Sequence, residues 1–200
     1  MFPSSARDTV VRKLILYLFL GPLIAVGYSQ AQSATQQAVP KTKLEAFEAQ
    51  EGAVLIRGFT QIGDLRGAYG GLIAVKSQEF TNATTGRKEY GITIDVKETG
   101  RLEREDRAFI DYEEIPSLIK GIDYISKVDK CSTKLDNYQA DYRTKGDFQI
   151  SKFSASGEDM FSVSSGRIGR TSVYLKSTDM TKFRDLIGRA KAKLDSIKSP

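Results

Sequence analysis

Two stretches of this chain read as a strand that runs directly into an amphipathic helix, at residues 109–130 and 172–197. In the first helix Pro116 suits the opening turn, where its missing N–H needs no partner. The apolar residues of this helix recur at helical spacing, at Ile115, Leu118, Ile119, Ile122, Ile125 and Val128. Those of the second helix are Met180, Phe183, Ile187, Ala190, Leu194 and Ile197. Each helix therefore has one apolar side that must be buried, and the rest of the fold has to cover both.

Strand patterns precede each of these helices. Before the first helix they cover residues 53–62, 71–82, 89–97 and 106–113. Before the second helix they cover residues 136–144, 148–155, 160–164 and 171–176. The glycine-rich residues 63–71 read as a loop, and residues 43–50 as a short helix ahead of the first strand. In the third strand Ile92 and Ile94 alternate with polar residues such as Thr93, which predicts one buried and one solvent-facing side.

These elements predict an α+β fold that is mainly antiparallel β. It consists of two four-strand units, each followed by a helix, after a short N-terminal helix. Each half has a one-sided sheet and one amphipathic helix, and burying both requires packing them together. We therefore expect a single domain over residues 43–200.

The order of four strands, helix, four strands and helix is similar to that of the Whirly family of single-stranded-DNA-binding proteins. The resemblance covers residues 53–197 and implies the same element order and an affinity for single strands. The lysine-rich strand motif of that family, KGKAAL, has no counterpart here, since Gly86-Arg87-Lys88 differs from it. The resemblance therefore assigns no binding residues to this chain.

The N-terminal residues have the three-part plan of a secretory signal peptide. The leader is basic, at Arg7, Arg12 and Lys13. An apolar run follows at residues 14–26, and Ser29 and Ala31 supply small side chains for a cleavage site. This run is shorter than the roughly 20 residues of a membrane span. We expect residues 1–31 to be a signal peptide and residues 32–42 a flexible lead-in; an uncleaved anchor is the alternative.

The mature protein is then expected to be exported, periplasmic or extracellular, with no integral membrane span. Loss of residues 1–31 removes three basic residues and one acidic residue, so the formal net charge falls from +5 to +3. Much of the basicity thus belongs to the signal peptide, which makes nucleic acid an unlikely partner.

Several kinds of chemistry are excluded by composition. The chain has no histidine and one cysteine, which excludes Ser-His-Asp and Cys-His catalysis and the usual zinc and iron–sulfur sites. It has no phosphate-binding glycine motif. We expect no cofactor and no metal, and any catalysis would have to use carboxylates, lysine or tyrosine. We expect the single cysteine, Cys131, to be inert or partly buried rather than functional.

The most site-like stretch is the loop at residues 164–170, SSGRIGR. Gly166 and Gly169 could turn backbone N–H groups toward an anion, and Arg167 and Arg170 could clamp it. These four residues are the candidate ligand-binding residues; an ordinary hairpin loop with exposed charges is the alternative.

Three weaker candidates remain. An acidic region could form a carboxylate pair or a calcium site, or simply be solvated: Glu103, Glu105, Asp106, Asp111, Glu113 and Glu114. Residues 67–71 could let a ligand approach the backbone, or form a plain turn. Tyr138 and Tyr142 could stack bases or sugars, or pack on a sheet.

The sequence does not identify a specific function. The chain lacks the histidine- and cysteine-based catalytic arrangements named above, and it is predicted to be exported. Both points favour a non-catalytic binding or protein-interaction domain whose partner is a protein or a small ligand. A polyanion or single-stranded nucleic-acid binder and a carboxylate-dependent extracytoplasmic hydrolase are the alternatives. Whether the protein is an enzyme stays open, and the balance of these observations is against it.

Overall fold

The structure is a computed structural model that describes residues 39–100, 103–155 and 158–198. The predicted signal peptide and residues 32–38 of the predicted lead-in lie outside the described residues. The first half contains α1 (Lys43–Glu48), β1 (Leu55–Arg66), β2 (Leu72–Asn82), β3 (Lys88–Glu98), β4 (Arg104–Asp111) and α2 (Ile115–Lys127). The second half contains β5 (Gln139–Arg143), β6 (Gln149–Ala155), β7 (Glu158–Ser165), β8 (Thr171–Leu175) and α3 (Ser177–Lys198).

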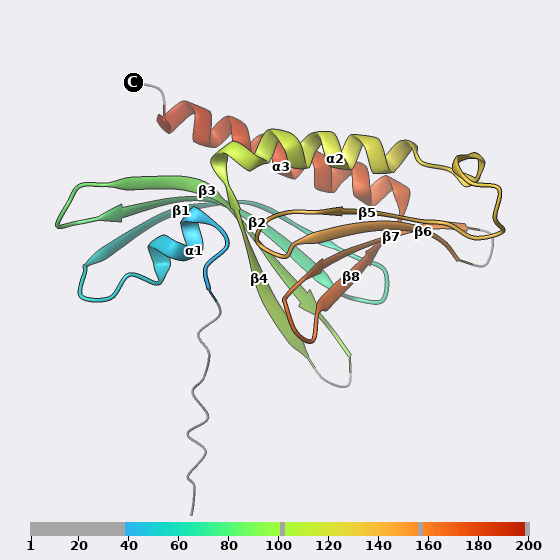
Figure 1. The fold of residues 1–200 in the computed structure, drawn as a ribbon, viewed down its shortest axis with the longest axis horizontal. Helices are drawn as coiled ribbons and strands as arrows, with labels where there is room; N and C mark the ends of the chain where they lie inside the picture. Colours follow the sequence, from blue (N-terminus) through green and yellow to red (C-terminus); the bar gives the residue numbers. More distant parts are fainter. Residues whose placement is uncertain (1–38, 101–102, 156–157, 199–200) are drawn as a thin grey trace, which may run out of the picture. The chain divides into compact units, whose positions relative to one another are not determined.

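Within these residues the strands form two four-stranded antiparallel sheets, in the orders β1-β2-β3-β4 and β5-β6-β7-β8. Each sheet is a meander that leads into a helix, α2 after the first sheet and α3 after the second (Figure 1). The predicted α+β fold class is therefore confirmed, including the short N-terminal helix. No helix among the described residues is both long enough and apolar enough to cross a membrane.

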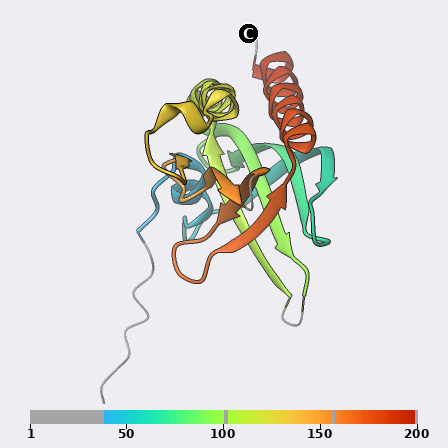
Figure 2. The same ribbon diagram turned by 90° about the vertical axis from the view of Figure 1, so that its right-hand side faces the viewer.

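The main apolar cluster of the described residues draws on both sheets and on both long helices. The stripe of α2 contributes Ile115, Leu118, Ile122 and Ile125, all buried. On α3, Phe183 packs against Phe148 beside β6, with ring centroids 6.1 Å apart. The same helix reaches the first sheet, where the Ser77 hydroxyl donates to the Ala190 carbonyl at 3.0 Å. Figure 2 shows α2 and α3 on the same side of the strands. The two sheets are thus joined by α3, which packs on both.

The second face of the first sheet is covered where we expected solvent, and that prediction for β3 is wrong. Thr93 is fully buried and Asp95 nearly so. Two basic side chains lie over Asp95, with Lys76 Nζ at 2.7 Å and Arg107 Nε at 2.5 Å from its oxygens. Nearby, α1 adds a small apolar cluster of Leu44, Phe47, Phe80 and Phe109. Strand alternation does not reveal such a cover, because the covering residues come from elsewhere in the chain.

The loop predicted at residues 63–71 begins later, because β1 continues to Arg66. The register of the β1–β2 pair shifts between Gln61 and Gly63, so Ile62 forms a β-bulge. A Cβ atom on Gly63 would lie 2.7 Å from a methyl carbon of Leu186 on α3. This glycine therefore allows a helix to approach the strand closely, and it does not mark a turn.

The end of the predicted lead-in is anchored to the fold. Thr42 is buried and caps α1, accepting a hydrogen bond from the Glu45 backbone N–H at 3.0 Å. Lys41 forms an ion pair with Asp147, in the β5–β6 turn, at 2.6 Å. Residues 39–42 thus connect α1 to the second sheet's turn and take part in the site described next.

Candidate functional site

The loop between β7 and β8, which contains the predicted ligand-binding residues, lies next to α1 and the β5–β6 turn. Gly166 has a φ of 109° and Gly169 a φ of 65°, conformations that glycine adopts at little cost. Arg167 and Arg170, however, have different partners. Arg170 donates a hydrogen bond to the Gln149 side chain on β6. Of the four predicted residues, Gly166 and Arg167 line a cleft in the surface, whereas Gly169 and Arg170 are not part of its lining.

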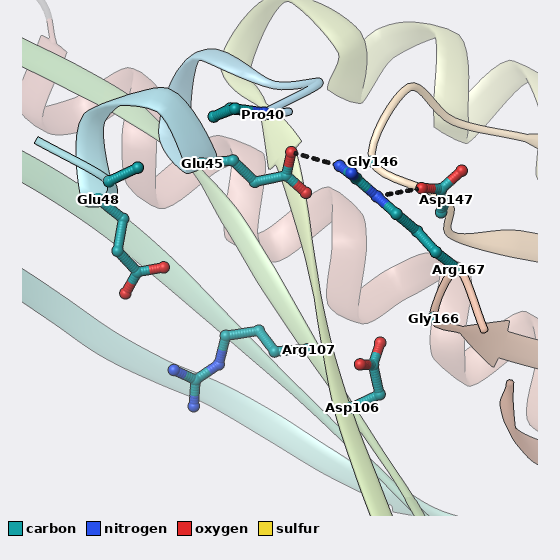
Figure 3. Close-up of a pocket in the computed structure, with 10 residues that line it drawn as sticks. Pro40, Glu45, Glu48, Asp106, Arg107, Gly146, Asp147, Gly166 and Arg167 are labelled. Atoms are coloured by element: carbon teal, nitrogen blue, oxygen red, sulfur yellow. Dashed lines mark hydrogen bonds and ion pairs between the residues drawn. The ribbon is translucent and has the colours of Figure 1, made fainter. Parts of the chain in front are cut away.

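Arg167 bridges two carboxylates that are distant in sequence. Its Nε lies 2.8 Å from Asp147 and one terminal nitrogen lies 3.4 Å from Glu45 (Figure 3). Another nitrogen donates to the Val39 carbonyl at 3.0 Å. An anion bound by this guanidinium would have to compete with both carboxylates. Glu45 and Asp147 therefore belong to the site, although no local sequence pattern connects them with Arg167.

The cleft has a volume of about 450 Å³ and is bordered by α1, β4, the β5–β6 turn and the β7–β8 loop. Its charged lining residues are Glu45, Glu48, Asp106, Arg107, Asp147 and Arg167. Carboxylates thus outnumber guanidinium groups in the lining, four to two. The site that the loop helps to build is therefore more acidic than the loop sequence alone suggests.

Most of these charges have a partner of opposite sign within the described residues. Glu48 pairs with Arg57 at 2.9 Å, and Arg107 pairs with Asp95. For Asp147, partial burial alone would raise the pKa, but the hydrogen bond from Lys41 and the nearby positive charges outweigh it and leave the pKa below its ordinary value. These ion pairs hold the walls of the cleft together.

Asp106 is the exception among the cleft carboxylates. It projects from β4 and accepts a hydrogen bond from the Ser165 hydroxyl. Among the described residues, no lysine or arginine lies within ion-pair distance of it. Figure 3 shows its carboxylate next to Gly166 and below the Arg167 bridge. Asp106 is thus a partly buried carboxylate, held by a hydroxyl group, that can pair with a basic group from another molecule.

The remaining residues of the predicted acidic region lie elsewhere. Glu103 and Glu105 are exposed on β4 and its preceding turn. Asp111 is buried and accepts from the backbone N–H groups of Lys43 and Leu44, at 3.0 and 3.1 Å, at the start of α1. Glu113 pairs with Lys43 at 2.8 Å. The acidic stretch is thus divided among several places, and no group of residues suited to a metal ion is found in the described part of the chain.

Glu114 has an unusual environment. One of its oxygens accepts from the Lys145 backbone N–H at 2.9 Å, while the other is buried without a hydrogen-bond partner among the described atoms. Burial raises the pKa of Glu114 above its ordinary value. Glu114 and Asp111 line the same small pocket, of about 280 Å³, together with Ser117 and Lys145.

The glycine-rich loop at residues 67–71 lies against β8, the edge strand of the second sheet. The Ala68 N–H donates to the Tyr174 carbonyl at 2.8 Å. Tyr69 has a φ of 64°, rare for a tyrosine, and its side chain is 82% exposed. Its ring meets that of Tyr174 edge-on at 6.0 Å, and Tyr174 meets Phe153 at 6.3 Å. The sequence did not indicate this aromatic row, because its members come from separate segments.

Tyr142 of β5 and Tyr138, which directly precedes β5, both contact other residues of the protein. The ring of Tyr142 lies against Gly121 of α2 and its hydroxyl donates to Ser117 at 3.1 Å. Tyr138 donates to Asp159 at 2.6 Å, and burial together with this hydrogen bond raises the pKa of Tyr138 to about 12. Cys131 is exposed in a short turn after α2, so of the expected alternatives partial burial is not found, and an inert thiol stays a prediction.

Comparison of the chain with protein-family models, with curated proteins and with solved structures found no match. The similarity to the Whirly family therefore stays one of element order, and the function has to be argued from the site.

Proposed function

We propose that the protein is a non-catalytic binding domain that works outside the cytoplasm, and that its charged cleft receives a basic side chain of a protein partner. The support for export is the signal-peptide pattern of residues 1–31. The observation that carries the binding proposal is Asp106, a cleft carboxylate held by Ser165 and lacking a basic partner among the described residues. A lysine or arginine from a partner would complete this pair.

The surrounding charges fit a peptide better than a polyanion. Glu45 and Asp147 already neutralise Arg167, so an added phosphate would meet carboxylates on both sides. Arg107 is partly exposed at the other end of the lining and could meet an acidic group beside the basic one. Complementary charges of this kind select partners and orient them more than they add affinity.

The proposal can be tested by titrating the mature protein with three probes: hexalysine, hexaglutamate and an oligothymidylate. We expect saturable, salt-sensitive binding of hexalysine, observed by NMR shifts of residues in the cleft. Asp106→Asn keeps an acceptor for Ser165 but removes the charge, and should weaken binding several-fold, since an exposed ion pair contributes up to about 1 kcal/mol. Asp136→Asn, an exposed aspartate outside the cleft, is the matched control.

The other outcomes distinguish the alternatives. Binding of oligothymidylate that is lost in Arg167→Ala and Arg170→Ala would favour the polyanion binder. Binding of hexalysine that is equal in wild type and Asp106→Asn would contradict the cleft as the site. Absence of shifts in the cleft with any probe would contradict the proposal as a whole.

A hydrolase is the second candidate, because Asp111 and Glu114 share a pocket and the pKa of Glu114 is raised. A carboxylic acid with a raised pKa beside a second carboxylate is a pattern used in acid–base catalysis. Both groups also hold backbone N–H groups of other segments, which is a structural role. Turnover of p-nitrophenyl esters or glycosides that Glu114→Gln abolishes would favour the hydrolase; equal background rates in both proteins would remove it.

A further inference from the structure

The outer edge of β1 is long and unpaired. β1 covers residues Leu55–Arg66 and forms a ladder with β2 on one side, while no strand of the described residues pairs with its other side. Residues 56–61 are all exposed. A strand edge of this kind presents a row of free N–H and C=O groups, which is a template for another strand.

The other sheet edges carry the protections that usually prevent such pairing. β5 and β8 are short, with five residues each, and Ala68 bridges to Tyr174 on β8. β4 begins with four consecutive charged residues, Arg104 to Arg107. Among the edges that the structure describes, β1 is the longest; β8 also lacks charged residues, but it is short and bridged by Ala68.

The exposed part of β1 is also apolar. Residues 54–63 contain a single charge, Arg57, and no proline. The side chains of Val54 and Phe59 are each 68% exposed, and that of Ile56 is 56% exposed. Phe59 lies opposite Gln78 and Ile56 opposite Thr81, so the two project from opposite faces of the sheet. A strand added here would cover apolar side chains on both faces.

The open edge has a defined end. At the bulge, Arg189 of α3 donates to the Ile62 carbonyl at 3.2 Å, and Leu186 lies over Gly63. At Ile62 and Gly63 the strand is therefore in contact with the helix. The bulge and the helix contacts interrupt the regular edge at Ile62 and Gly63, which limits the length and position of any strand added along residues 55–61.

We propose that the open edge of β1 pairs antiparallel with β1 of a second copy of this chain, which joins the two first sheets into one continuous sheet. The argument for a second copy is self-complementarity about a two-fold axis. Because Arg57 is the only charge of residues 54–63, every two-fold register except one centred on Arg57 avoids opposing like charges. Arg57 is also partly neutralised by Glu48.

The register centred on Phe59 fits best. It sets the two Phe59 side chains against each other on the same face and places Arg57 opposite the partner subunit's Gln61. No bulge lies between Arg57 and Gln61, so the facing side chains share a face along this stretch. Aromatic cross-strand pairs stabilise such a ladder. The edge contacts the charged cleft through the Arg57–Glu48 ion pair, and the residues that line the cleft come from segments other than β1.

The test is the mass of the mature full chain in solution, measured by sedimentation equilibrium over a range of concentrations. Every protein carries Cys131→Ser, so that the exposed thiol cannot link two copies. We expect a dimer for the parent protein and a dissociation constant raised about tenfold or more in Phe59→Lys. Tyr124→Lys is the matched control, since Tyr124 is 75% exposed on α2, away from the edge, and should leave the dimer unchanged.

A cross-linking experiment checks the register. Facing Cα atoms of an antiparallel pair are about 4.5–5.5 Å apart, within the range of a disulfide. Phe59→Cys should therefore oxidise rapidly to a covalent dimer. Gln61→Cys should not, because the two Gln61 residues would be separated by roughly four residues, or about 14 Å, along the strands.

Three results would overturn the proposal. The first is a parent protein that is monomeric at every concentration. The second is a dimer that Phe59→Lys leaves unchanged, which would place the interface elsewhere. The third is equal cross-linking at Phe59→Cys and Gln61→Cys. If Phe59→Lys failed to fold, as judged by circular dichroism, the comparison of Phe59→Cys with Gln61→Cys would still test whether the β1 edges pair in this register.

Discussion

At the scale of single residues, Gly121 shows how a glycine can be required by packing rather than by the backbone. It lies inside the apolar stripe of α2, where glycine lowers helix propensity. A Cβ atom at this position would lie 2.4 Å from a ring carbon of Tyr142. The space that a side chain would need is therefore already filled by β5.

We predict that Gly121→Ala destabilises the protein by about 1–3 kcal/mol, because overpacking outweighs the gain in helix propensity. Gly188 of α3 is the control, since a Cβ atom there would meet nothing within 4 Å. Gly188→Ala should raise the unfolding free energy by up to about 1 kcal/mol. Urea unfolding measures both; equal and stabilising effects of the two changes would contradict the packing argument.

The buried Asp95 network predicts a pH dependence. Burial alone would raise the pKa of Asp95, but hydrogen bonds from Arg107 and Lys76 outweigh burial and leave the pKa below its ordinary value. A depressed pKa in the folded state means that ionised Asp95 stabilises the fold above its unfolded pKa, near 4, and that this contribution is lost as the pH falls further.

We therefore expect the difference in unfolding free energy between wild type and Asp95→Asn to be largest at neutral pH and to shrink below about pH 4. Denaturant unfolding from pH 7 down to pH 2 would measure it. A difference that stays constant over this range would show that the charge of Asp95 does not contribute.

These residue-scale features are the least accessible to sequence reasoning. Residue types identified Arg167 and Asp106 as candidates, but not their partners. Arg167 pairs with Glu45 and Asp147 from two distant segments, and Asp106 accepts from Ser165, which lies beside Arg167 in sequence. Likewise the alternation of β3 correctly identified Ile92 and Ile94 as buried and failed for Thr93. Such contacts depend on tertiary packing, which no local pattern contains.

At the scale of elements, the helices were predicted well because their periodicity spans many residues. Five of the six residues expected on the stripe of α3 are buried, and Ile197, near its end, is partly exposed. The strands were located with errors at their ends. The largest error came from Gly63, where a glycine that admits Leu186 was taken for a turn.

Ile122 lies at the centre of the α2 stripe, with 1% of its surface exposed. We predict that Ile122→Asp abolishes folding, because it buries a charge without a partner. Tyr124→Asp changes a neighbouring exposed residue of the same helix and should leave the fold intact. Circular dichroism and thermal unfolding would compare them; a soluble Ile122→Asp protein with unchanged melting would show that this side of α2 is not core.

At the scale of the whole molecule, the two sheet-and-helix halves share one apolar cluster, which was expected from the one-sided pattern of each half. How they share it was not predictable, because α3 follows the second sheet yet also covers the first. The Ser77–Ala190 hydrogen bond and the contact of Leu186 with Gly63 both connect α3 to the first sheet.

The predicted export of the protein, with removal of residues 1–31, can also be tested directly. Expression of residues 1–200 in a bacterium should yield an extracytoplasmic protein that begins at Gln32, as read by mass spectrometry of its N-terminal peptide. A protein that keeps residues 1–31 and fractionates with membranes would support the uncleaved anchor instead.

The position of α3 across the first sheet also sets the order in which the protein can mature. β1 to β4 are complete once residue 111 has been made, but their helix-facing side gains the cover of Leu186 and Ala190 only after residues 177–198 follow. Contacts that close over so long a span form late. During synthesis the nascent chain thus stays open and suited to handling by chaperones, and a truncation before residue 177 would leave an uncovered sheet for proteases.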